Sequence, residues 1–415
     1  MREVFRQRSF QKIFFSNLFS GFGQGMSIIG ISWYLVNQAG SAHVLGTTMF
    51  ISSILFFFIG PYLGTLIDRF SRKNLLLFVN GLGFVVLGFC AVWGFALPYQ
   101  DWMLILIYMV TLFINQIHYP TQSALVQESF TDRHYNDINS LLEIESQTAS
   151  VLAGGVAGIF LEQLGLPIVL LFDGLTYLFA FGLISTLDYR FTLAHHVKAN
   201  AGKNWWSQLH DSWLFIRGKR GFLVFGTTAM LPFVAVMVGN LLAPVWVNQT
   251  LHANVIIFST HEMTYAVGAV AAGFLVMHMT RRFGALAAMV GNMVMFSLVL
   301  GFIVMLPYGW MFVFLTTFIG WGNTSVRLIR QNVYMRIVPK QHMGRVLSFF
   351  QSVGMFVRLI LLGSFTLMID ITGAGAAYLV LAFLVILGAL GCFFSMRSLL
   401  TEDSDQALHL NTVEE

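Results

Sequence analysis

Charged side chains are scarce in this chain of 415 residues, because Asp, Glu, Lys and Arg together account for only 10% of it. Soluble domains carry about 25% charged residues and roughly 45–50% apolar ones. This sequence is instead 57% hydrophobic, with a mean hydropathy of +0.74, which excludes an ordinary water-soluble globule. Apolar runs of about 20 residues recur along the chain, as membrane-spanning helices require. The runs do not alternate apolar and polar residues as the strands of a β-barrel would.

Cysteine is nearly absent as well, and the two that occur, Cys90 and Cys392, each lie inside an apolar run. We interpret both as small apolar packing residues rather than a disulfide, a metal site or a nucleophile. The chain has no Gly-x4-Gly-Lys sequence, which argues against an ATP-driven pump. It also lacks the cluster of His, Asp or Ser that a polytopic membrane enzyme would need at one membrane face. We therefore expect no enzyme activity, no metal and no cofactor.

The apolar runs predict an all-α polytopic membrane protein with twelve transmembrane helices in two pseudo-symmetric six-helix bundles. The first six spans are expected at roughly 12–37, 43–67, 74–97, 101–128, 137–163 and 167–187. The second six are expected at roughly 221–249, 255–280, 285–306, 309–336, 345–368 and 374–397.

Four segments follow from this division. The predicted bundles occupy residues 1–187 and 221–397, separated by a polar linker at 188–220 and followed by an acidic tail at 398–415. Within the linker, "WWSQLHDSWLFI" places Trp and aliphatic residues at helical spacing beside Lys and Arg. This pattern is typical of a helix that lies on the inner membrane surface; the alternative is an extended polar linker.

Lys and Arg are distributed unevenly over the predicted loops. With the N-terminus placed inside, all but three of the 23 Lys and Arg residues fall in or beside inner loops. The exceptions, Arg327, Arg330 and Arg358, lie inside predicted spans. Because Lys and Arg favour cytoplasmic loops, both termini are expected in the cytoplasm. The asymmetry also explains the pI near 9.1 without invoking nucleic-acid binding.

The stretch "GTLIDRFSRKN" concentrates charge immediately after the second predicted span. It supplies Gly64, Asp68, Arg69, Arg72 and Lys73. This arrangement resembles the loop signature of the major facilitator superfamily, in which Asp-Arg follows a Gly by four residues and precedes a basic pair. A weak internal echo supports two parallel repeats, since "IDRFS" after the second span resembles "TRRFG" after the eighth. Such repeats place a binding cavity between two bundles near the membrane midplane.

Further stretches are similar to one branch of that superfamily, the macrolide-efflux and enterobactin-exporter-like transporters. They are "RSF", "AGS", "DGLTYL", "LLAPVW" and "VPKQHMGRV". The resemblance implies a secondary active transporter that exports a small amphipathic compound, such as a drug-like natural product or a siderophore. It implies a bacterial inner-membrane protein, acting as a monomer within the lipid bilayer.

The resemblance also implies a gate on the cytoplasmic side. Asp68 would meet the N-terminal end of a second helix, where a carboxylate gains about 0.3–1 kcal/mol from the helix dipole. The gate residues implied are Gly64, Asp68, Arg69, Arg72, Gly344 and Arg345. The alternative is that the basic residues only mark a cytoplasmic loop.

Ionisable groups inside predicted spans are functional candidates, because each costs at least about 2.5–3.5 kcal/mol in the membrane. The proton-coupling candidates are Glu145, Glu262, Glu143 and Asp173. The substrate-cavity candidates are Arg358, Gln24, Asn115, His118, Asn323 and Arg327. Structural alternatives stay open: Arg330 and Glu143 could extend to the inner surface, Asp173 could reach outer water or cap a helix, and His118 could bond a neighbouring backbone.

Three departures from the family pattern bear on the coupling. Gln24 stands where branch members often have Asp, Ser71 replaces the signature Gly, and the fourth span lacks the Arg of many drug–proton antiporters. The fifth span lacks the usual Pro and instead carries packing glycines. These are Gly154, Gly155 and Gly158. Proton antiport is the leading expectation, and uptake, another coupling ion or lysolipid flipping stay open as alternatives.

Overall fold

The computed structural model is all-helical over the residues that it describes, which are 2–39, 42–130, 134–189, 213, 216–219, 221–338 and 340–411. No strand occurs among them, as the apolar runs predicted. The chain forms two compact units. Unit 1 comprises Met1–Ala201 and Ala243–Ala266, and unit 2 comprises Gly202–Leu242 and Val267–Glu415.

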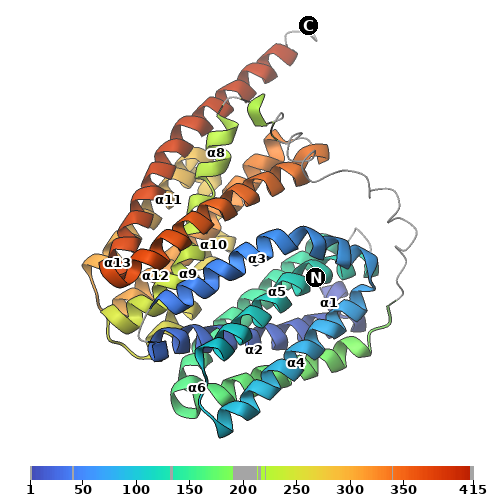
Figure 1. Cartoon of the computed structure of the whole chain (residues 1–415). Coiled ribbons are helices and arrows are strands. Elements are labelled where there is room, and N and C mark those ends of the chain that lie inside the picture. The colour runs from blue at the N-terminus through green and yellow to red at the C-terminus, as the bar shows by residue number, and fades with distance from the viewer. Residues whose placement is uncertain are drawn as a thin grey trace. The chain divides into compact units, whose positions relative to one another are not determined.

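Unit 1 is built mainly from six consecutive helices, which Figure 1 shows in blue to green. They are α1 (Arg2–Phe5), α2 (Arg8–Ala39), α3 (Ala42–Arg69), α4 (Arg72–Ala96), α5 (Asp101–Ser129) and α6 (Tyr135–Ser185). Helices α2 and α4 both pack along α6, and α5 contacts α2, α3 and α4. Helices α5 and α6, which carry most of the polar candidates of the unit, thus both pack against α2 and α4.

Helix α6 is 51 residues long, about twice the length that one membrane crossing requires. Its backbone leaves helical geometry at Gly165, where φ is 80° and ψ is 169°. A positive φ of this kind is readily adopted only by glycine, and Pro167 follows. The sequence placed a break between residues 163 and 167, and the glycine is the physical reason for it.

Unit 2 contains α8 (Phe222–Thr228), most of α9 (Leu231–Val245), the later part of α10 (Val255–Phe283), α11 (Ala285–Met305), α12 (Gly309–Ile337) and α13 (Lys340–Asn411). The end of α9, the π-helix η3 (Trp246–Thr250) and the start of α10 belong to unit 1. Helix α11 packs between α12 and α13, and α13 also contacts α8. Helix α13 departs from helical geometry at Gly373, where φ is 74°, within the predicted loop between 368 and 374.

One predicted span, 221–249, is divided in the structure. Helix α8 ends at Thr228 and α9 begins at Leu231, with two turn residues between them. Pro232 has no N–H to donate and its ring clashes with the preceding turn, so it breaks a continuous helix at this point. This break was not predicted, because the surrounding residues are uniformly apolar.

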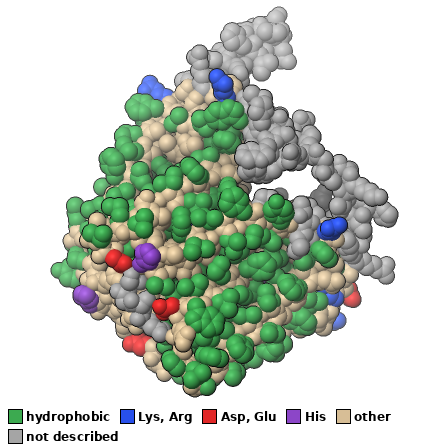
Figure 2. Space-filling model, in the orientation of Figure 1, with side chains coloured by type: hydrophobic (Ala, Val, Ile, Leu, Met, Phe, Trp, Pro, Cys, Tyr) green, Lys and Arg blue, Asp and Glu red, His purple; other side chains and the backbone are tan. Residues whose placement is uncertain are grey.

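Eight of the described helices are long and apolar enough to cross a membrane. Hydrophobic side chains cover most of the face that Figure 2 shows. Large apolar groups such as Phe58, Phe89 and Phe274 are more than half exposed, as expected for residues that face lipid rather than water. The chain is thus a multi-span membrane protein, and the count of twelve spans stays a prediction. The surface helix expected around Trp206 lies outside the described residues.

Candidate functional site

Polar side chains recur at helical spacing on three neighbouring helices of unit 1. Helix α2 carries Asn17 and Gln24, seven residues apart, and α5 carries Asn115, His118 and Gln122 at spacings of three and four. Positions with these spacings lie on one face of a helix. A third polar row on α6 runs through residues 139, 143, 146 and 150. The three rows give one bundle a polar interior in an otherwise apolar sequence.

The three rows line a cavity of about 550 Å³ inside unit 1. Its volume falls within the roughly 300–1,000 Å³ typical of small-molecule sites. The predicted candidates among its lining residues are Gln24, Asn115, His118, Glu143 and Glu145. The structure therefore brings five of the separately chosen candidates to one place.

The wall of the cavity is partly fixed by hydrogen bonds. His118 Nε2 lies 3.1 Å from Asn17 Oδ1, and the carboxyl group of Glu145 lies beside the same Asn17 side chain. Gln24 Nε2 donates to the backbone oxygen of Thr111 over 3.1 Å. Asn17 on α2 thus joins His118 of α5 to Glu145 of α6, and the contact ties three helices together at the cavity.

The two glutamates of the cavity differ in environment. Glu145 is 5% exposed and its contact to Asn17 lies inside the bundle. Glu143 is exposed, and Gln147 Nε2 donates to its Oε1 over 3.1 Å along the same helix. Burial disfavours the charged form of a carboxyl group, so gaining or losing a proton changes the free energy of a buried carboxyl more than that of an exposed one. Glu145 is therefore the stronger coupling candidate of the two.

One buried polar atom near the cavity wall, Tyr177 Oη, has no hydrogen-bond partner of good geometry among the described residues, and its side chain is 1% exposed. The Asn17 amide nitrogen faces the carboxyl group of Glu145, since Asn17 Oδ1 is the atom that faces His118. Both atoms are enclosed by protein rather than open to the cavity.

Asp173 lies elsewhere in unit 1, fully buried where α6 crosses α2. A Cβ atom at Gly23 would come within 2.6 Å of Asp173 Oδ1, so only glycine permits this approach. Thr176 Oγ1 lies 3.4 Å from the same oxygen, and Asp173 Oδ2 has no donor of good geometry among the described residues. Complete burial does not fit the alternative that Asp173 reaches outer water.

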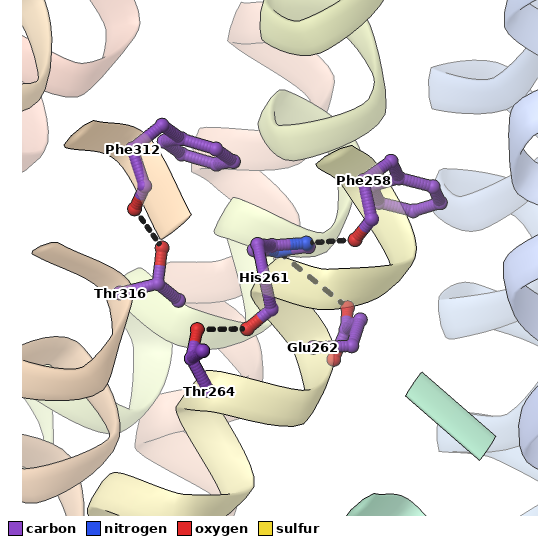
Figure 3. Close-up of polar contacts among 6 residues, drawn as sticks. All are labelled: Phe258, His261, Glu262, Thr264, Phe312 and Thr316. Atoms are coloured by element: carbon purple, nitrogen blue, oxygen red, sulfur yellow. Dashed lines mark hydrogen bonds and ion pairs between the residues drawn. The ribbon is translucent and has the colours of Figure 1, made fainter. Parts of the chain in front are cut away.

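Glu262 is on α10 (Figure 3). It is not among the residues that line the cavity. Its Oε1 lies 3.7 Å from His261 Nε2. His261 Nδ1 contacts the backbone oxygen of Phe258, and Thr264 Oγ1 donates to the His261 oxygen over 3.0 Å. When Nδ1 carries the proton for that carbonyl, Nε2 can donate to Glu262 only if the ring is doubly protonated. Figure 3 also shows a hydrogen bond within α12, between Thr316 and Phe312.

Arg72, the first residue of α4, is part of a buried ion pair and is not an exposed loop residue. Its Nε lies 3.6 Å from Glu128 Oε2, and the two side chains are 3% and 4% exposed. The Tyr189 hydroxyl donates to the same carboxylate oxygen. Burial, followed by the hydrogen bond to Glu128, raises the pKa of Tyr189, so its hydroxyl keeps the proton that it donates.

Two lysines bind the end of α6 beside this pair. Lys73 Nζ donates to the backbone oxygens of Ser185 and Leu187, both over 2.7 Å. Lys12 Nζ donates to the Thr186 oxygen over 2.5 Å. Cations at a helix C-terminus bind its unpaired carbonyl groups and offset its dipole. Lys12 of α2 and Lys73 of α4 therefore hold these two helices to the end of α6.

The remaining gate candidates are Gly64, Asp68, Arg69, Gly344 and Arg345. The side chains of Asp68 and Arg345, and the environments of Gly64 and Gly344, lie outside the described part of the chain. Arg69 is exposed. The gate therefore stays a prediction, with Arg72 bonded inside unit 1.

The candidates Asn323, Arg327 and Arg358 belong to unit 2. Asn323 is buried on α12, Arg327 is exposed on the same helix, and Arg358 is half-buried on α13. Nearby, Arg330 Nη1 donates to the backbone oxygen of Ala229 over 2.7 Å. Ala229 lies in the break between α8 and α9, so Arg330 satisfies a carbonyl that the broken helix leaves without its usual partner.

The three glycines of the fifth predicted span make a close helix contact within unit 1. A Cβ atom at Gly154 would lie 2.4 Å from Met263 N, and one at Gly158 would lie 2.1 Å from Ser259 Oγ. At Gly155 the nearest atom would be Met263 Sδ, at 3.2 Å. Small residues let helix backbones approach in membranes, and here they let α6 approach the first part of α10.

Comparison with known proteins identifies the family. The sequence profile of the Major Facilitator Superfamily matches residues 13–239, more than half of the chain. The chain belongs to the Major Facilitator Superfamily. It is therefore a membrane transporter of that superfamily, whose members bind small-molecule substrates. No curated protein matches it, and its branch within the superfamily is not established.

Solved structures of the superfamily share the fold. A point mutant of the nucleoside transporter NupG aligns with a TM-score of 0.70 at 15% identity, over 94% of this chain and all of that one. A bacterial homologue of the iron transporter ferroportin gives 0.66 at 16% identity, over 92% of this chain and 98% of that one. An auto-inhibited POT family peptide transporter gives 0.69 at 14% identity, over 94% and 97%. Similarity at this level establishes the fold alone.

Several residues of the site were not predicted from the sequence, among them Asn17, Tyr177, Glu128 and Tyr189. A signal for Asn17 was present, because it stands seven residues before Gln24 on the same helical face. Glu128 and Tyr189 carry no such signal, since they meet only through the packing of distant helices.

Proposed function

We propose that this superfamily member is a secondary active transporter that exports a small amphipathic compound by alternating access, in exchange for protons. The observation that carries the proposal is the unit 1 cavity. It joins a buried carboxyl group, Glu145, to a histidine through Asn17, and its volume suits a small molecule. A transporter needs such a place, where one group changes its protonation state beside a substrate.

Glu145 is the first candidate for the group that binds and releases the coupled proton. A carboxyl group inside a membrane protein is costly when charged and unpaired, so its protonation changes the stability of the conformation that holds it. Asp173 and Glu262 are secondary candidates, because they are not among the residues that line the cavity. Asp68 is proposed as the gate carboxylate on the strength of the loop signature, and transport should be lost in Asp68→Asn while the protein still folds and inserts.

The related structures do not choose the substrate. Their titles name nucleosides, iron and peptides, so one fold carries compounds of different chemistry. The assignment to export, the bacterial inner membrane and a monomeric state rest on the sequence resemblance and are part of this proposal.

The proposal is tested with purified protein in proteoliposomes under an imposed pH gradient. Candidate natural-product drugs and siderophores should accumulate against their own gradient only when the proton gradient is present, and Glu145→Gln should abolish this. Glu262→Gln tests the second candidate. Glu162→Gln is the matched control, because Glu162 is on α6 but bonds Asn254 and does not line the cavity. Accumulation that ignores the pH gradient would remove proton coupling, and movement in the opposite direction would replace export by uptake.

A further inference from the structure

The fixed charges that the described residues can place around the unit 1 cavity are negative, apart from the imidazole of His118. Two carboxyl groups, Glu143 and Glu145, are among its lining residues, and no Lys or Arg is among those that the structure describes around it. The imidazole of His118 is the other titratable group apart from the tyrosines. An anionic group that entered would lose its hydration without meeting a fixed cation, which is strongly unfavourable.

The cavity is also rich in hydrogen-bonding groups. Amide side chains such as Asn115 and Gln122 line it, together with several serines. A polar group left unsatisfied in the interior costs about 1–3 kcal/mol, so a ligand with its own donors and acceptors would bind more tightly than a hydrocarbon.

Apolar groups complete the wall. Ile28, Ile114 and Leu142 face the same space, and Tyr119 adds an aromatic ring. The cavity thus provides an acidic group, amides and an apolar surface within one volume. A ligand that matches all three is a compound with a positively charged end, polar substituents and an apolar body.

We propose that the substrate is an amphipathic organic cation, a protonated amine whose charged group docks against Glu145 and Glu143. This deepens the proposed function, on which it rests, by choosing the charge of the transported compound. Glu145 is the main anchor because it is buried, and an ion pair is stronger where water is excluded. Among the substrate types considered, amine-bearing natural products fit the cavity and anionic siderophores do not.

The test is a binding assay with three fluorescent probes that share one body. Dansylcadaverine ends in an ammonium group, its N-acetyl derivative is neutral, and dansyl-6-aminohexanoate ends in a carboxylate. Binding to the purified transporter in detergent is measured by fluorescence, with no gradient. Because charged hydrogen bonds are worth more than neutral ones, the ammonium probe should bind about tenfold or more tightly than either of the others.

Variants locate the binding. Glu145→Gln should weaken the ammonium probe about tenfold and leave the neutral probe nearly unchanged, which also shows that the variant is folded. Glu143→Gln should have the same direction with a smaller effect, since Glu143 is exposed and already accepts from Gln147. The control Glu162→Gln should bind all three probes as the wild type does.

Equal binding of the three probes, or no measurable binding of the ammonium probe, would overturn the proposal. Tighter binding of the carboxylate would also overturn it and would direct attention to Arg358 of unit 2 as the substrate anchor. Because the assay uses no gradient, its result is separate from that of the transport experiment. Selective cation binding without proton-driven accumulation would retain the substrate class and remove the coupling.

Discussion

Arg72→Ala should destabilise the transporter far more than its position in a cytoplasmic loop signature suggests. Arg72 Nε lies 3.6 Å from Glu128 Oε2, and both side chains are almost fully buried. Removing one member of such a pair leaves the other charge buried and costs about 3–5 kcal/mol. We expect a value near the lower end, about 3 kcal/mol, because the Tyr189 hydroxyl still donates to Glu128 in the variant.

The measurement is the free energy of unfolding in mixed micelles, followed by titration with a denaturing detergent. A double-mutant cycle of Arg72→Ala and Glu128→Gln isolates the interaction between the two side chains, which should be within about 0.5–3 kcal/mol for residues in contact. Arg69→Ala is the matched control. It removes an exposed Arg from the same loop, and such changes usually stay within about 0.5 kcal/mol.

The reasoning would be refuted if Arg72→Ala and Arg69→Ala lowered the free energy of unfolding equally, or if the coupling in the cycle were zero. Either result would show that the ion pair adds little stability, and would leave Arg72 only the predicted role of a basic loop residue under the positive-inside rule. A loss of transport with unchanged stability would instead support the predicted gate.

Three further predictions concern other parts of the molecule. Gly154→Ala should destabilise the protein by about 1–3 kcal/mol, because its Cβ would lie 2.4 Å from the backbone nitrogen of Met263. A Cβ atom at Gly182 on the same helix would contact no neighbouring atom within 4 Å, so Gly182→Ala should be neutral or slightly stabilising. Equal unfolding midpoints for the two variants would contradict this. The pKa of Tyr189 is raised in the folded protein, so the stability that its hydroxyl contributes is complete below the unfolded-state pKa of about 10 and is lost as pH rises through the folded pKa. The difference in unfolding free energy between wild type and Tyr189→Phe, measured from pH 8 to 11, should therefore shrink or reverse as pH rises. A difference that stays constant over this range would contradict the prediction. Arg330→Met should cost about 1–3 kcal/mol by leaving a helix-break carbonyl without its donor, and the same detergent titration would show no change if the carbonyl is satisfied otherwise.

Much of the fold follows from local features of the sequence. Apolar runs of sufficient length set the helices, and Gly165 and Gly373 mark reversals because only glycine adopts their positive φ. The division at Ala229 was not foreseen, because the break depends on how Pro232 and a distant arginine act on an apolar helix.

The candidate site was predictable in composition and not in arrangement. Individual polar residues such as His118 and Glu145 stand out in apolar spans, and their cost in the membrane identifies them. Which of them share a cavity depends on the rotation of each helix about its axis, and one sequence does not determine that rotation. The pairing of Arg72 with Glu128 depends on the same packing, between residues 56 positions apart in the chain.

The lysines at the end of α6 have a consequence for the order in which the protein forms. Lys12 and Lys73 are made early, and the carbonyl groups that they bind, on Thr186 and Leu187, follow 174 and 114 residues later. During insertion, before those carbonyl groups exist, these ammonium groups can act only through the preference of Lys for cytoplasmic loops, the side that the sequence predicts for their ends of α2 and α4. Once α6 is complete, the same charges become donors to its last carbonyls. One pair of side chains is thus expected to act first on topology and then on the assembly of α2, α4 and α6.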